Sequence, residues 1–145
     1  MFSTFSNIFK TTYKKISFED MQQAIRMTDH YIIINTMSVT EQDYLIKNTI
    51  SYQMEENIIN ELLTNYDMKT RKFVVYGKNA NDESAEKKYK QLVSLGFMEV
   101  YIYLGGMFEW VILQDIYGVD EFPTTRKVLD ILKFKPAKML GQMYY

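Results

Sequence analysis

The stretch Phe73-Val74-Val75-Tyr76-Gly77-Lys78-Asn79-Ala80-Asn81-Asp82 determines the fold that we expect for this chain. Its first four residues, all β-branched or aromatic, predict a strand that is buried on both faces, as in a parallel sheet. Gly77 ends the strand, and the polar residues after it predict a loop. A helix is expected next, over residues 84–95, because apolar residues recur there at helical spacing before Gly96: Ala85, Tyr89, Leu92 and Val93.

Strands and helices also alternate on both sides of this stretch. Tyr31-Ile32-Ile33-Ile34 and Val100-Tyr101-Ile102-Tyr103-Leu104 predict two further buried strands. Helices are expected over 18–27, after a capping-box variant formed by Ser17 and Asp20, and over 54–65 and 108–116. This alternation predicts an α/β fold, with a central parallel sheet that carries helices on both faces. No repeat or Pro/Gly-rich linker divides the chain, so we expect one domain, over residues 16–123.

In such a sheet the binding crevice lies at the carboxyl ends of the strands, where loops lead into helix N-termini. Two segments take that place. One is the loop after the second strand: Gly77, Lys78, Asn79, Ala80, Asn81 and Asp82. The other is the pair Gly105-Gly106 after the third strand, which matches neither phosphate-binding glycine motif and is expected to form a tight turn.

The composition excludes several kinds of chemistry. The 145 residues contain no cysteine and a single histidine, so a disulfide scaffold, a thiolate metal site and a cysteine nucleophile are all excluded. The Gly-x-Ser-x-Gly motif of serine hydrolases is absent, and the polar residues at 79–83 depart from the pattern of a calcium-binding loop. We therefore expect no metal, no cofactor and no small-molecule substrate.

The spacing of these elements resembles a rhodanese-homology domain. In that family a strand ends in an active-site loop that begins with Cys and leads into a helix, and the next strand leads to a Gly-Gly pair and a Trp. Gly77 stands at the start of the corresponding loop here, and Gly105, Gly106 and Trp110 match the second element. The resemblance covers residues 16–118 and implies a single rhodanese-like domain. Residues 113–118 and 122–125 are similar to rhodanese-like proteins of single-celled eukaryotes and large DNA viruses.

The resemblance also identifies what this chain lacks. Rhodaneses transfer sulfane sulfur through a Cys thiolate, and the related Cys-loop phosphatases need the same thiolate and an Arg at the end of the loop. Gly77 and Asp82 occupy those two positions here. Lys78 is the one cation of the loop, whereas Asp82 and Glu83 place two negative charges at the helix N-terminus, where they offset its attraction for an anion. The family comparison therefore implies no catalytic residue and neither sulfurtransferase nor Cys-phosphatase activity.

Charge is distributed unevenly along the chain. The net charge of -1 combines +3 over residues 1–15, -8 over residues 16–123 and +4 over residues 124–145. We expect a basic, aromatic N-terminal segment, 1–15, and a basic C-terminal tail, 124–145, that packs on the domain or on a partner. Candidate partner contacts are aromatic and basic residues of the two ends: Phe2, Phe5, Phe9, Lys133, Lys135, Lys138, Tyr144 and Tyr145.

The sequence thus favours a catalytically inactive rhodanese-like domain that acts as a protein-binding or structural module, with a protein partner or through self-association. Residue types with AT-rich codons (Phe, Tyr, Met, Ile, Lys and Asn) are abundant, which indicates an AT-rich genome, as in many protists and large DNA viruses. For a viral source we expect a role in the virion or its assembly. One alternative is an enzyme of altered mechanism that uses Asp82, Glu83 and a bound cation in the former pocket. The other is weak nucleic-acid association through the basic ends. No secretory signal or membrane span is expected, so the predicted location is the cytoplasm, or the host cytoplasm or virion for a viral protein.

Overall fold

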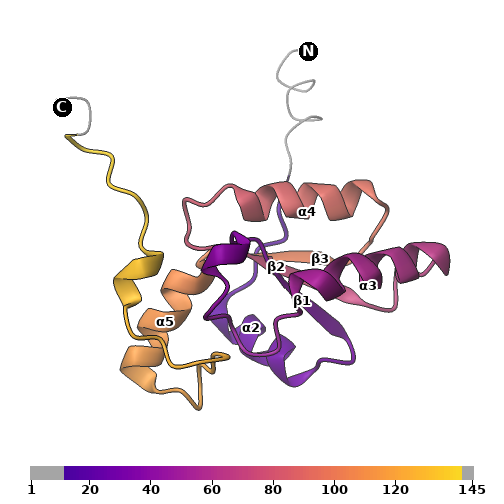
Figure 1. Ribbon diagram of the computed structural model, residues 1–145. Helices are drawn as coiled ribbons and strands as arrows, with labels where there is room; N and C mark the ends of the chain where they lie inside the picture. The colour runs from indigo at the N-terminus through magenta and orange to yellow at the C-terminus, as the bar shows by residue number, and fades with distance from the viewer. Residues whose placement is uncertain (1–11, 142–145) are drawn as a thin grey trace.

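A parallel three-stranded sheet forms the centre of the protein, in the order β1-β2-β3 (Figure 1). The computed structural model describes residues 12–141, and residues 1–11 and 142–145 lie outside the described part. Strand β1 spans Tyr31–Asn35, β2 spans Lys72–Tyr76 and β3 spans Val100–Tyr103. Val74 of β2 pairs with Ile33 on one side and with Tyr101 on the other.

Short segments extend the sheet beyond both outer strands. Lys15 forms a parallel bridge with Ile102 beside β3, and Thr49 forms another with Ile33 beside β1. The Ile16 amide donates to the Ile102 carbonyl over 2.9 Å, and the Ile50 amide donates to the Ile33 carbonyl over 3.0 Å. These contacts satisfy part of the backbone that an open sheet edge would leave unpaired.

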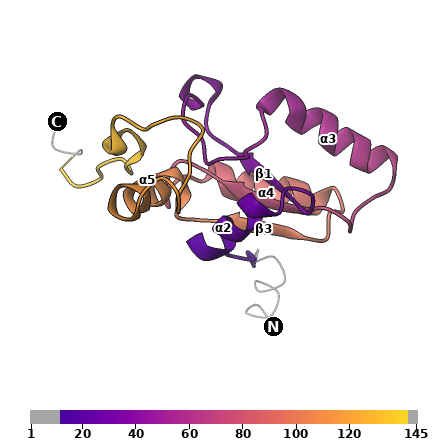
Figure 2. The ribbon, with the colours of Figure 1, turned by 90° about the horizontal axis from the view of Figure 1, so that it is seen from below.

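Four α-helices in the described residues cover the sheet, two on each face (Figures 1 and 2). Helices α3 (Tyr52–Thr64) and α4 (Ser84–Ser94) pack on one face, and α2 (Phe18–Arg26) and α5 (Gly106–Tyr117) pack on the other. Two short 3-10 helices, η1 (Val39–Glu41) and η2 (Ile131–Phe134), lie in the connections. The expected α/β fold, with a parallel sheet and helices on both faces, is confirmed.

The uninterrupted apolar strands contribute side chains to two separate cores, because successive side chains point to opposite faces of the sheet. On the side of α3 and α4, Ile32, Ile34, Phe73 and Val75 pack with Leu92 and its neighbours. On the side of α2 and α5 the core is built from Ile33, Val74, Tyr76, Tyr103, Met107 and Trp110, among others. A strand with helices on both sides needs no polar alternation, which is why the runs are continuous.

The helix boundaries shift by one or two residues from the sequence prediction. The capping box of α2 is present, because the Ser17 hydroxyl accepts from the Asp20 amide and the Asp20 carboxylate accepts from the Ser17 amide. Helix α5 begins at Gly106 rather than at residue 108. Val93 is half exposed on α4, so the prediction that it belongs to the buried stripe of this helix is wrong.

The segment from Phe122 to Phe134 packs on the domain. Both of these phenylalanines are buried in the core on the side of α2 and α5. The Lys47 amide donates to the Pro123 carbonyl over 3.1 Å, and the Thr125 amide donates to the Leu45 carbonyl over 2.8 Å. The tail therefore completes the fold as far as η2, whereas Leu140 beyond it is 84% exposed.

Candidate functional site

The loop after β2 and the turn after β3 lie against each other at the carboxyl edge of the sheet. The Met107 amide donates to the Gly77 carbonyl over 3.0 Å, and the Phe108 amide donates to the Lys78 carbonyl over 2.9 Å. Two amides of the first turn of α5, which a helix leaves without an internal partner, thus bind the backbone of the neighbouring loop. They are not directed at an open anion site.

Gly106 makes this close approach possible. It has a φ of +65°, and a Cβ atom added to it would lie 2.6 Å from the Gly77 carbonyl oxygen and 3.1 Å from the Asn79 nitrogen. Only glycine combines a left-handed conformation with such contact between backbones. The tight turn predicted at Gly105-Gly106 is present, and the position of the loop explains why its second residue is glycine.

The carboxylate of Asp82 organises the loop. Its Oδ2 accepts from the Lys78 amide over 2.9 Å, while its Oδ1 accepts from the Ser84 amide over 3.0 Å and from the Ser84 hydroxyl over 2.7 Å. Partial burial acts to raise the pKa of Asp82, but the hydrogen bonds from Lys78 and Ser84 outweigh it and hold this pKa below its ordinary value. The loop therefore carries a fixed negative charge of its own.

This carboxylate lies where a side chain at position 77 would project. A Cβ atom added to Gly77 would lie 2.6 Å from Asp82 Oδ2 and 3.1 Å from the Thr36 hydroxyl oxygen. Thr36 Oγ1 is in turn 2.7 Å from Ser84 Oγ, so it is tied to the same network. A side chain at position 77 therefore requires the Asp82 carboxylate to shift, which disturbs the hydrogen bond that its Oδ2 accepts from the Lys78 amide.

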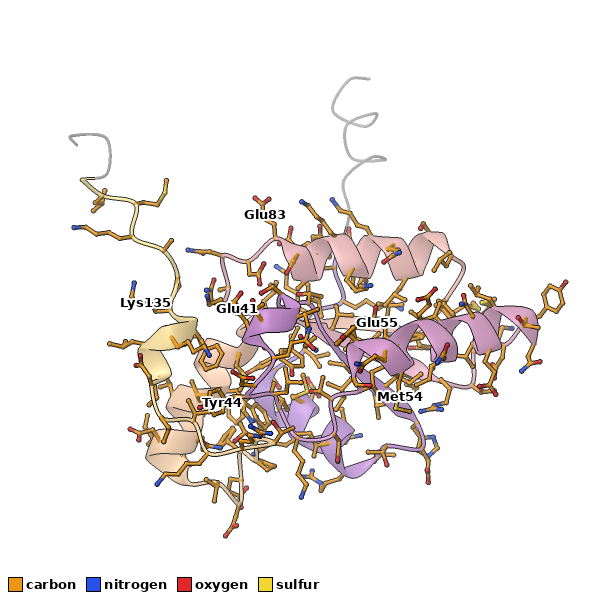
Figure 3. The ribbon with its side chains drawn as sticks, in the orientation of Figure 1. Glu41, Tyr44, Met54, Glu55, Glu83 and Lys135 are labelled. Carbon is orange, nitrogen blue, oxygen red and sulfur yellow. The ribbon has the colours of Figure 1, made fainter. Side chains whose placement is uncertain are left out.

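Lys78, the one cation of the loop, is paired. Its Nζ lies 2.6 Å from Glu41 Oε2 on η1, and the Ser38 hydroxyl donates to the other Glu41 oxygen over 2.9 Å. The hydrogen bond from Lys78 is the largest influence on Glu41 and lowers its pKa. Figure 3 shows Glu41 on η1, facing the loop.

Asn79 connects the loop to the C-terminal tail. It is buried, its side-chain oxygen accepts from the Asn81 amide over 3.0 Å, and its Nδ2 donates to the Phe134 carbonyl over 3.0 Å. Ala80 and Asn81 form the exposed tip of the loop. Among the loop residues singled out from the sequence, Lys78 and Asn79 thus contact other segments, whereas Asp82 binds within the loop and the start of α4.

A cavity of about 600 Å³ lies beside the loop. It is lined by the loop, by the η1 segment and by three tail residues, Lys135, Ala137 and Met139. A second cavity of about 570 Å³ continues it between η1, α3 and α4, and the two share Thr36, Met37, Ser38 and Ser84. The tail therefore borders the crevice that the strand order predicts at this edge of the sheet.

The geometry gives no support to a cation site built from Asp82 and Glu83. Both oxygens of Asp82 already accept hydrogen bonds, while Glu83 is exposed, projects outward before α4 (Figure 3) and is not among the residues that line the cavity. Within residues 12–141, no cluster of three or more His, Asp or Glu side chains is arranged to hold a metal ion. The polar side chains beside the loop are instead hydrogen-bonded to one another and to the backbone.

Trp110 is fully buried at the centre of the second core. Its ring makes edge contacts with Tyr103 and Phe122, with centroids 6.1 and 5.0 Å apart, and its Nε1 donates to the Pro123 carbonyl over 3.1 Å. This residue therefore anchors the start of the tail segment to α5 and has no place in the cavity.

The candidate partner residues of the two ends are only partly visible in the structure. Lys133 Nζ lies 5.2 Å from the centroid of the Tyr44 ring, Lys135 borders the cavity, and Lys138 is exposed. The others lie outside the described residues: Phe2, Phe5, Phe9, Tyr144 and Tyr145.

Two contacts of the loop, with Glu41 and with Phe134, had no signal in the sequence because their partners are 37 and 55 residues away.

Comparison with known proteins identifies the family. The model of the rhodanese-like domain matches residues 17–113, so the chain belongs to the rhodanese-like family. The expected resemblance is confirmed over most of the range from which it was inferred. No curated protein sequence matches the chain.

Solved structures show the same fold. A full-length protein from Lactobacillus plantarum is 17% identical, with a TM-score of 0.57 over 78% of this chain and 88% of that one. The single-domain sulfurtransferase of Saccharomyces cerevisiae is 17% identical, with a TM-score of 0.54 over 79% and 98% of the two chains. The As-Sb reductase from Leishmania major is also 17% identical, with a TM-score of 0.50 over 73% and 79%. At this level of identity the similarity establishes the fold alone.

The protein is therefore a rhodanese-like domain that contains no cysteine. A sulfurtransferase reaction that depends on a Cys thiolate has no nucleophile in this chain. No helix in the described part of the chain is long and apolar enough to span a membrane.

Proposed function

We propose that the protein is a non-catalytic rhodanese-like domain that acts as a protein-binding module. The observation that carries this proposal is the Asp82 carboxylate, which lies 2.6 Å from the position of a Cβ atom at Gly77. The resemblance assigns the nucleophile of the family to position 77. A carboxylate at that place would raise the pKa of a thiol at position 77, because a neighbouring negative charge disfavours the thiolate.

The use of the backbone amides supports the same conclusion. The amides of Lys78 and Ser84 donate to Asp82, the Asn81 amide donates to Asn79, and those of Met107 and Phe108 donate to loop carbonyls. A site that stabilises a bound anion needs such donors to be free and directed at the ligand. Here they stabilise the loop itself, so we infer a structural role for it.

The tail supports protein binding over nucleic-acid binding. Met139 and Leu140 are 79% and 84% exposed, and large apolar side chains on a surface mark sites of protein interaction more often than contacts with phosphate. The charge of -8 over residues 16–123 also opposes a polyanion. A role in viral assembly is one form of this proposal.

A sulfurtransferase assay tests the non-catalytic half of the proposal. With thiosulfate and cyanide, the purified chain should give no turnover above the uncatalysed rate, whereas a rhodanese with its loop cysteine serves as the positive control. Gly77→Cys should also be inactive, because the Asp82 carboxylate occupies the space of the new side chain. Alkylation of the introduced thiol should be faster in Gly77→Cys/Asp82→Ala than in Gly77→Cys. Turnover by the wild-type chain would contradict the proposal.

Fluorescence anisotropy with a labelled DNA and a labelled RNA tests the nucleic-acid alternative. At low salt, where phosphate contacts are strongest, we expect no saturable binding. Binding that weakens steeply as salt is added would support the basic ends as a nucleic-acid site and would count against the protein-binding module.

A further inference from the structure

A small apolar groove lies between α2 and the end of α5, on the opposite face of the sheet from α3 and α4. Its volume is about 340 Å³, at the lower end of the range for ligand pockets, ~300–1,000 Å³. Its lining includes the apolar residues Phe18, Leu113, Tyr117 and Phe122 and the acidic residues Glu19 and Glu121. We call it the α2–α5 groove. It is suited to bind one or two apolar side chains that have a basic residue next to them in the sequence.

The groove is held in shape by contacts on both sides. The ring of Phe122 packs against Phe18 and Tyr117, with centroids 5.6 and 6.1 Å apart, and the Gln22 side chain donates to the Glu121 carbonyl over 2.8 Å. Tyr117 is nevertheless 65% exposed. An exposed aromatic ring that its neighbours hold in place needs no reorganisation to bind a partner, which favours association.

The C-terminal tail has the complementary chemistry. Beyond η2 it carries Lys135 and Lys138, followed by Met139 and Leu140 with exposed fractions of 79% and 84%. The chain continues to Tyr145 with one more methionine and two tyrosines. Two basic residues thus stand directly before a run of apolar ones, which matches a groove that is lined by apolar and acidic side chains.

The groove and the tail of one molecule point in different directions. In Figure 1 the described part of the tail leaves the domain on the side of α4, whereas α2 lies on the other side of the sheet. Figure 2, which shows the molecule from the side of α2, places the tail beside α5 and directed outward. To reach the groove of its own molecule, the tail would have to turn back around the domain. The tail of a second copy needs no such turn.

We propose that residues 135–145 of one copy bind in the α2–α5 groove of another. The inference names a partner for the protein-binding module and so rests on the proposed function. Groove and tail are different surfaces, so the contact is heterologous, and an open assembly has one free groove and one free tail at its ends. Such contacts produce rings when the rotation closes and open chains when it does not.

Sedimentation velocity over a range of concentrations tests this inference. The wild-type chain should shift to larger species as its concentration rises. A groove variant, Tyr117→Lys/Glu121→Lys, and a tail variant, Met139→Asp/Leu140→Asp, should each weaken self-association about tenfold or more, the effect of losing a central contact. These four side chains are exposed, so the variants should retain the circular-dichroism spectrum of the wild type. Val93→Asp, on α4, is the matched control and should associate like the wild type.

A mixing experiment distinguishes this arrangement from any other dimer. The tail of the groove variant and the groove of the tail variant are both intact, so an equimolar mixture should form a 1:1 dimer and nothing larger. A monomeric wild type, or self-association that the groove and tail variants leave unchanged, would overturn the inference. The sulfurtransferase assay is independent of this result, so the inference can fail while the non-catalytic proposal stands.

Discussion

Two connections from a strand to a helix meet at the carboxyl edge of this sheet, and they differ in what they have retained. The turn after β3 keeps the Gly-Gly pair and the Trp that the family resemblance predicts, and both Gly106 and Trp110 are buried. The loop after β2 begins with Gly77, lacks the nucleophile, and is built around the Asp82 carboxylate. One connection preserves the family pattern, and the other departs from it.

The difference follows from what each residue contacts. Gly106 and Trp110 touch the backbone of other segments, the Gly77 carbonyl and the Pro123 carbonyl, so any replacement disturbs the packing of the whole edge. A loop nucleophile acts on a substrate and contributes little to packing, so its loss costs the fold little. The comparison predicts that substitutions in the turn will destabilise the protein far more than substitutions in the loop.

Trp110→Ala should give the largest effect. The indole is fully buried among Tyr103, Phe122 and their neighbours, and removal of a buried aromatic ring costs about 3–5 kcal/mol in the free energy of unfolding. Denaturation by urea, followed by circular dichroism, measures the loss. Trp110→Phe is the matched control and should lose less, because it removes the bond to Pro123 but keeps most of the ring. Equal losses in both variants would assign the effect to the hydrogen bond.

Gly106→Ala should destabilise the protein by about 2–4 kcal/mol, because it adds a collision with the Gly77 carbonyl to a left-handed conformation that alone costs about 1–2 kcal/mol. Gly96→Ala isolates the second contribution. Gly96 follows α4 with a φ of +104°, and the nearest atom to a Cβ atom added there is Met68 Sδ at 3.8 Å, an ordinary van der Waals distance. The same urea titration should therefore show a smaller loss for Gly96→Ala. If the two variants lose the same free energy, the close approach of loop and turn is unimportant.

Asp82→Ala should cost about 1–2 kcal/mol, since it leaves the amides of Lys78 and Ser84 without their acceptor in a partly buried loop. The pH dependence of the stability shows how much of this loss comes from the negative charge of Asp82. Because the pKa of Asp82 is lower in the folded protein than in the unfolded chain, its contribution is present above the unfolded value of about 3.9 and is lost as the pH falls through the folded value. Wild type should therefore lose more stability than Asp82→Asn as the pH is lowered below about 4. If wild type and Asp82→Asn lose stability in parallel as the pH falls, the hydrogen bonds to Asp82 do not stabilise its charged form.

Glu41→Gln should have the smallest effect. The ion pair with Lys78 is about one third exposed on each side, and such pairs contribute about 0–1 kcal/mol. Chemical denaturation should give a change within this range, and added salt should reduce it further. A loss as large as that of Gly106→Ala would mean that η1 and the loop form one rigid unit, and would remove the contrast between loop and turn.

Much of the fold could be predicted from the sequence because its signals are local. Continuous apolar runs such as Ile32-Ile33-Ile34 and Val74-Val75 indicate strands buried on two faces, and Ser17 with Asp20 marks the start of α2. The prediction was wrong where local periodicity was the only guide. Val93 repeats with the buried residues of α4, yet it is half exposed, because the helix turns only a narrow face toward the sheet.

The site could be predicted only in its position. That Gly77 and Asp82 lie at the carboxyl edge followed from the strand–loop–helix order. Their relation to each other did not, because the place of the Asp82 carboxylate depends on the path of a loop that is fixed from outside by Met107, Phe108 and the Phe134 carbonyl. These contacts join residues more than 25 positions apart, and spacing along the chain does not indicate which of them will meet.

The sequence by itself determined that this is an α/β domain with no thiol and with basic ends on an acidic middle, because these properties depend on residue type and local order. Tertiary structure alone decided what lies beside Gly77. The absence of a side chain at Gly77 leaves space, and folding fills that space with a carboxylate that satisfies the Lys78 and Ser84 amides. A partly buried donor without a partner destabilises the folded state, and the Asp82 carboxylate supplies the acceptor that these two amides need.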